Sequence, residues 1–101
     1  MPMHVPLEPD AIAAFESALR ADGYLEILTR DIAALTQVPT HTHAFDVRAL
    51  MLAGELDLSV GGQTQRYGAG DVFIVAGGVE HAEQFGSTAA RYLVGRRALN
   101  M

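Results

Sequence analysis

Glycine turns divide the chain between residues 24 and 97 into short segments, each long enough for a β-strand. In the clearest segment, Leu56, Leu58 and Val60 alternate with polar residues and would therefore share one face of a strand. Gly61-Gly62 follows with the permissive backbone that a two-residue hairpin requires. Such spacing is typical of all-β sandwiches and barrels. The expected strands span residues 24–30, 40–45, 47–52, 55–60, 63–67, 72–75, 81–85 and 91–97.

One helix is expected ahead of these strands. Residues 1–8 contain prolines and predict an irregular arm, and residues 9–22 predict a helix, with Pro9 suited to its first turn. The apolar positions between Ile12 and Leu19 fall on one face of that helix. We expect this face to cover the outside of a barrel or a partner subunit.

The length of 101 residues, half of them hydrophobic, fits one domain over residues 1–101 with one core. A chain this short leaves much of its surface exposed, strand edges included. Exposed edges favour pairing with a second copy, so a homodimer is expected.

Charge and composition argue against several classes of partner. A net charge of -5 argues against a nucleic acid, because phosphate binding needs clustered Lys and Arg. The chain has no cysteine, so a metal ion would have to bind nitrogen and oxygen ligands. No apolar run approaches the roughly 20 residues that cross a bilayer, and residues 1–10 lack the segments of a signal peptide. We therefore expect a cytoplasmic protein without membrane contact.

Three of the four histidines form a candidate metal site. His41 and His43 are separated by one residue, which in a strand places both imidazoles on one face. His81 could reach them from a neighbouring strand. Neutral imidazole suits Zn, Ni, Cu and Fe(II), and three nitrogen ligands leave positions open for water or substrate. Alternatively, His41 and His43 lie exposed on a rim and His81 is a hydrogen-bonded strand residue.

Glu83 is the candidate catalytic carboxylate. It follows His81 by two residues and so would lie on the same strand face. There it could complete a metal shell, act as a general base or hold a substrate by a hydrogen bond. Exposed at a strand end, it would do none of these.

The pattern of histidines and glycines resembles the two signature motifs of the cupin superfamily. His41-Thr42-His43 followed by Gly54 resembles the first motif, and Gly70-Asp71 followed by Gly78 and His81 resembles the second. The resemblance covers residues 41–85. It implies a cupin-type double-stranded jelly-roll β-barrel preceded by the short helix. It also implies a divalent metal ion (Zn, Ni, Fe or Mn) on His41, His43 and His81.

The sequence departs from the family pattern at several positions. Val47 stands where the family's ligand Glu would fall, and Asp46 precedes it. Strand alternation turns Asp46 away from the histidine face, whereas a bulge near Phe45 would bring it inward as a fourth metal ligand. Otherwise Asp46 is exposed, near Arg48 in the sequence or paired across strands. Three further motif positions differ, with Leu35 for a glycine, Ala76 for a proline and Phe85 for an asparagine.

Two functions fit these features. The first is a metal-dependent enzyme of oxygenase, isomerase or hydrolase type that acts on a small molecule inside the barrel, assisted by Glu83 or Asp46. The second is a non-catalytic barrel that binds or senses a small ligand. The histidines favour the enzyme, and the missing family Glu favours the binder.

Overall fold

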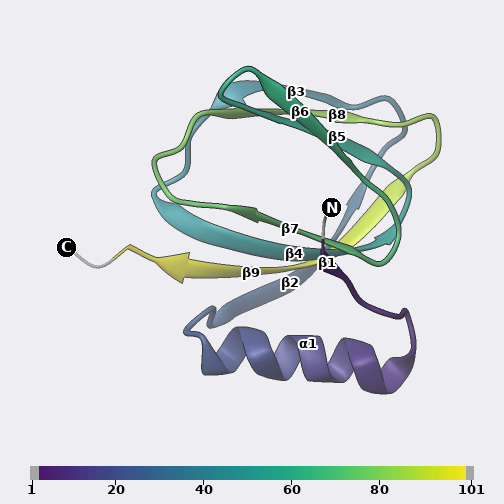
Figure 1. Cartoon of the computed structure of the whole chain (residues 1–101), viewed down its shortest axis with the longest axis vertical. Coiled ribbons are helices and arrows are strands. Elements are labelled where there is room, and N and C mark those ends of the chain that lie inside the picture. Colours follow the sequence, from purple (N-terminus) through teal and green to yellow (C-terminus); the bar gives the residue numbers. More distant parts are fainter. Residues whose placement is uncertain (1–2, 100–101) are drawn as a thin grey trace.

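The computed structural model describes residues 3–99, which form two antiparallel β-sheets and one α-helix (Figure 1). One sheet has five strands in the order β1-β7-β4-β9-β2, and the other has four in the order β3-β8-β5-β6. The elements are β1 (Met3–His4), α1 (Pro9–Ala21), β2 (Glu26–Ile32), β3 (Gln37–His41), β4 (Phe45–Ala53), β5 (Leu56–Val60), β6 (Gln63–Tyr67), β7 (Asp71–Val75), β8 (His81–Phe85) and β9 (Ala90–Ala98).

The prediction of an all-β fold after one helix is confirmed. Among the strands of residues 3–99, only β5 and β6 form a sequential hairpin. The other pairings join strands far apart in the chain, such as β4 with β9 and β5 with β8. The two sheets face each other, and within residues 3–99 they do not close into one continuous barrel. This arrangement brings β3 and β8, which carry histidines, side by side.

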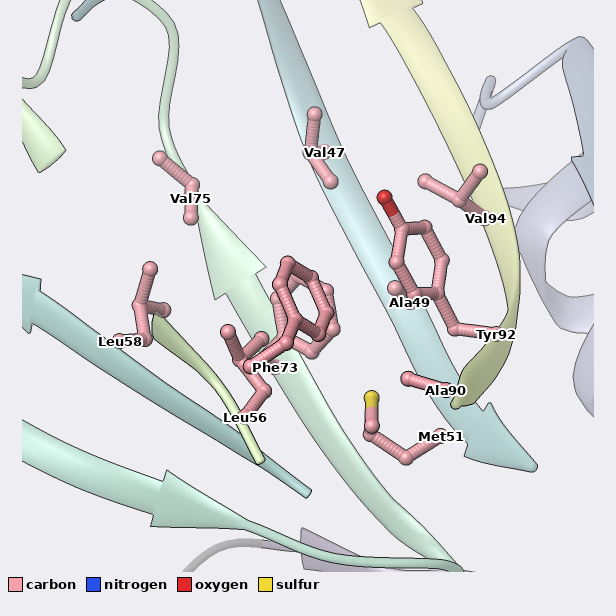
Figure 2. Close-up of a cluster of buried hydrophobic side chains, with 11 residues drawn as sticks. Val47, Ala49, Met51, Leu56, Leu58, Phe73, Val75, Ala90, Tyr92 and Val94 are labelled. Atoms are coloured by element: carbon pink, nitrogen blue, oxygen red, sulfur yellow. The ribbon is translucent and has the colours of Figure 1, made fainter. Parts of the chain in front are cut away.

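The main core lies between the two sheets. Figure 2 shows its side chains, with the Tyr92 hydroxyl directed past Ala49 toward the end where Val47 and Val94 lie. Alternation along β4 places Val47, Ala49 and Met51 in this core. The core consists of Val47, Ala49, Met51, Leu56, Leu58, Phe73, Val75, Phe85, Ala90, Tyr92 and Val94.

Helix α1 covers the outer face of the five-stranded sheet (Figure 1). Its buried side chains Phe15 and Leu19 pack with Leu50 and Leu93, which point outward from β4 and β9. The predicted apolar face of the helix therefore covers the sheet of its own chain. No helix between residues 3 and 99 is long and apolar enough to cross a membrane.

Two local predictions were wrong. The arm is not wholly irregular, because β1 pairs with β7. The predicted strand 40–45 is divided, since β3 ends at His41 and β4 begins at Phe45. His43 therefore lies in the connecting segment 42–44.

Leu35 stands where the family motif has a glycine. Its φ of 63° is the left-handed conformation that glycine adopts most easily, so the backbone at Leu35 has the conformation that favours the motif glycine.

Candidate metal centre

The fold brings His41, His43 and His81 together. His41 ends β3, His81 begins the neighbouring strand β8, and these two residues are register partners. His43 follows in the segment that leads into β4. One ring nitrogen from each histidine lies within 4.8 Å of the others. The structure thus assembles the three predicted ligands, although His43 does not belong to a strand.

Backbone carbonyls orient two of the imidazoles. The Nδ1 of His41 lies 2.8 Å from the carbonyl oxygen of Pro39, and the Nδ1 of His81 lies 3.0 Å from that of Val79. Because a carbonyl oxygen can only accept, both Nδ1 atoms carry the proton and donate it. Each Nε2 is then left with a free lone pair. This carbonyl support is the arrangement that orients histidine ligands in metal proteins.

The spacing of the His41 and His43 nitrogens fits a metal ion. The Nε2 atoms of His41 and His43 are 3.1 Å apart. Two nitrogens bound at about 2.0–2.1 Å to one ion, at angles of about 90–109°, are about 2.8–3.4 Å apart. In addition, the Nδ1 of His43 is buried without a hydrogen-bond partner among residues 3–99, so no protein group at Nδ1 fixes the tautomer of this ring. The donor set therefore fits a divalent ion that accepts imidazole.

The surroundings of His43 favour its neutral form. Its ring stacks on Phe45 at a centroid distance of 4.8 Å and an interplanar angle of 5°. Burial lowers the pKa of His43, and electrostatic interactions with the neighbouring His81, His41 and Arg96 lower the pKa further. Neutral imidazole is the form that binds a metal ion, so this ring is ready for coordination at neutral pH.

Asp46 lies outside this cluster, contrary to its inclusion among the predicted ligands. Its carboxylate accepts hydrogen bonds from the Gly77 N–H at 2.8 Å and from the Arg97 guanidinium at 2.8 Å. No bulge is present at Phe45, because Phe45, Asp46 and Val47 pair consecutively with β9. Strand alternation therefore turns Asp46 to the outer face, where it pairs across strands with Arg97, whereas Arg48 pairs with Asp22.

Asp46 instead supports the site from outside. Its bond to Gly77 joins β4 to the loop 76–80 that leads into His81. Next to it, the Gly78 N–H donates to the carbonyl oxygen of His43 at 2.8 Å. These two bonds hold the segments that carry His43 and His81 against each other. Asp46 is thus a positioning residue.

The Asp46 contacts predict a pH-dependent contribution to stability. The Gly77 N–H and the Arg97 guanidinium hold the pKa of Asp46 below its ordinary value of 3.8. A depressed carboxyl pKa stabilises the folded state above 3.8, and this contribution is lost as the pH falls through the folded-state pKa. In urea unfolding, Asp46→Asn should be less stable than the parent at pH 7. The difference should shrink below pH 4, and a difference that stays constant down to pH 2 would contradict this assignment.

The histidines open onto a cavity of about 170 Å³ between the sheets. Glu83 lines it and is half-buried, so the prediction that Glu83 shares the face of His81 agrees with the structure. Glu83 is not a member of the group of possible metal ligands. The lining residues are Arg30, Ile32, Val38, His41, His43, Phe45, Val47, Phe73, Val75, His81, Glu83, Phe85, Tyr92, Val94 and Arg96.

The sequence analysis missed three polar residues of this cavity, namely Arg30, Tyr92 and Arg96. Tyr92 is 5% exposed, and burial raises the pKa of its hydroxyl. The negative charge of Glu83 acts in the same direction on that pKa, and the positive charges of Arg30 and Arg96 oppose it. A signal for Arg30 was present in the sequence, since it alternates in phase with the apolar residues Leu28 and Ile32.

Several solved structures have this fold. A protein of unknown function from Rhizobium leguminosarum is similar with a TM-score of 0.67 and 22% identity, over 72% of this chain and 69% of that one. The cupin domain of Cnp3 from Schizosaccharomyces pombe is similar with a TM-score of 0.66 and 20% identity, over 72% of this chain and 55% of that one. The DMSP lyase DddQ from Ruegeria pomeroyi is similar with a TM-score of 0.64 and 26% identity, over 71% of this chain and 37% of that one. This chain therefore spans little more than half of Cnp3's cupin-domain structure and about a third of the lyase.

Comparison with curated protein sequences finds no match. Residues 31–94, however, match the family model described as the cupin domain, and they form more than half of the chain. The matched range includes all three clustered histidines and Glu83. On this match and on the shared fold, the chain belongs to the cupin family.

Proposed function

We propose that this protein is a metal-dependent enzyme that acts on a small molecule in the cavity between its sheets. The observation that carries the proposal is the convergence of three histidine nitrogens beside a half-buried carboxylate in the same cavity. Two of these histidines have fixed tautomers, and the third is held neutral by its surroundings. Among the similar structures is a lyase, so this fold accommodates enzymes.

His41, His43 and His81 would hold the ion, which when bound would supply Lewis acidity toward an oxygen atom of the substrate. Glu83 forms no ion pair or side-chain hydrogen bond within the described chain, so its carboxylate can accept a proton from a bound molecule. Aromatic and aliphatic side chains of the core line much of the rest of the cavity. This division of roles favours reactions that begin with proton transfer, as in isomerases and lyases.

A non-catalytic binding barrel is the second candidate. It is favoured by the position of Asp46, whose carboxylate is held by Arg97 and Gly77 and leaves the histidine cluster without a carboxylate ligand. A site of three neutral nitrogens keeps more of the ion's positive charge, which suits the retention of an anionic ligand. The two functions share the metal site and differ in the role of Glu83.

The metal content of untagged protein tests the shared site. Protein purified without chelators should contain close to one divalent ion per chain by plasma mass spectrometry, because the donor set is already assembled. A tag of histidines must be avoided, since it would bind the same ions. Protein that contains no metal and takes up no Zn, Ni, Fe or Mn at neutral pH would overturn the proposal.

Glu83→Gln separates a general base from a metal ligand. The carboxylate is outside the ligand group, so the variant should keep the same metal stoichiometry and change the metal affinity less than about tenfold. Metal content measured in parallel with the unmodified protein checks this result. If Glu83→Gln loses the ion, Glu83 belongs to the coordination shell instead.

A further inference from the structure

We propose that the molecule bound in this cavity is a small carboxylic acid whose carboxylate pairs with Arg30. The inference rests on the proposed function and names its class of substrate.

Arg30 faces the space between the sheets. It lies on β2 directly opposite Tyr92 of β9, and residues paired in this way share one face of a sheet. Tyr92 belongs to the inner core, and Arg30 also lines the histidine cavity. Arg30 is itself exposed, so its guanidinium remains accessible to solvent at the cavity wall.

Arg30 is the only arginine that has no carboxylate partner within the part of the chain that the structure describes. All seven basic residues of the protein are arginines, and they lie within this part. The six others form ion pairs at 2.6–3.3 Å: Arg20 with Glu16, Arg48 with Asp22, Arg66 with Asp57, Arg91 with Asp31, Arg96 with Glu26 and Arg97 with Asp46. Within residues 3–99, the one arginine without a carboxylate partner therefore lines the cavity that also contains the three histidines.

Charge in the cavity favours an anion. Glu26 offsets Arg96, whereas Glu83 lies on the other sheet and forms no ion pair with Arg30. With a divalent ion on three neutral histidines, the cavity would be positive even if Glu83 were ionised. The planar guanidinium matches a carboxylate with two parallel hydrogen bonds, which gives both attraction and orientation.

The cavity walls limit the rest of the ligand. A volume of about 170 Å³ is below the roughly 300–1,000 Å³ typical of drug-sized ligands. Val38, Val47, Val75 and Val94 line it with apolar surface. The ligand is therefore a short acid with a compact apolar body, and inorganic phosphate lacks that body.

Propionate and propionamide are the probes, because they differ mainly in charge. Untagged protein loaded with Zn²⁺ is titrated with each and followed by NMR, and the metal content is measured on the same samples. Propionate should bind at least tenfold more tightly than propionamide. Arg30→Met should lose at least tenfold in propionate affinity while keeping its Zn²⁺. Arg91→Met is the matched control, since it removes an equal charge from the adjacent register pair outside the cavity.

The outcomes separate the inference from the function on which it rests. Protein that takes up no Zn²⁺ overturns the proposed function and the inference with it. Protein that binds Zn²⁺ but holds propionate equally well with and without Arg30 overturns only the inference, because the ion alone then accounts for the binding. Phosphate that binds more tightly than propionate overturns the assignment to a carboxylic acid.

Discussion

His41→Ala and His81→Ala should each lose the bound metal ion and keep the fold. Each substitution removes one of three nitrogen donors, and the two that remain cannot hold the ion at the same affinity. Loss of a group that merely supports a ligand weakens metal binding by about 10–100-fold, so loss of a ligand should weaken it by at least about 100-fold. Metal content by plasma mass spectrometry and a competition assay with a chelator measure this loss.

His4→Ala is the matched control, because His4 is the remaining histidine and lies away from the cluster. Its side chain is 63% exposed and contacts Asp71 at 3.1 Å. This variant should bind metal as the parent does. Thermal unfolding of all three variants checks the fold, which matters most for His81 because it is 2% exposed. Unchanged metal content in both His41→Ala and His81→Ala would remove the three-histidine site.

The strands were predictable where the local pattern and the tertiary environment agree. Leu56 and Leu58 alternate with polar residues because one face of β5 packs on the core and the other is more accessible to solvent. The break at residues 42–44 was not predictable, since Thr42-His43-Ala44 continues the same alternation without a proline or glycine. Only the three-dimensional structure shows that β3 and β4 belong to different sheets.

The candidate site was predicted in part, for a similar reason. The approach of His81 to His41 depends on strand pairing, and the motif resemblance supplied what spacing alone could not. The outward orientation of Asp46 followed from the two-residue alternation of side chains along a strand. Its role in supporting loop 76–80 depends on a hydrogen bond from the Gly77 N–H, 31 residues away in the sequence. The importance of Arg30 appears only when the partners of the other arginines are known.

Gly54→Ala should be strongly destabilising, for two independent reasons. Gly54 has a φ of +80°, a conformation that disfavours any residue with a Cβ atom. An added Cβ would also lie 2.8 Å from the Cα of Ala90 and 2.9 Å from the carbonyl oxygen of Ala89. These atoms are largely backbone and cannot rotate away, so β9 would have to shift at its start. We expect a loss of about 3–4 kcal/mol in the free energy of unfolding.

Gly62→Ala isolates the first of these two effects. Gly62 has a φ of +81°, nearly that of Gly54, but nothing lies within 4 Å of a Cβ placed there. Gly62→Ala should therefore lose only about 1 kcal/mol in the free energy of unfolding, because only the backbone conformation opposes the added Cβ atom. Urea unfolding with an unchanged m-value measures the loss in the free energy of unfolding for both variants. If the two lose equal stability, the contact with β9 is not what requires glycine at position 54, and the conformation alone explains this motif glycine.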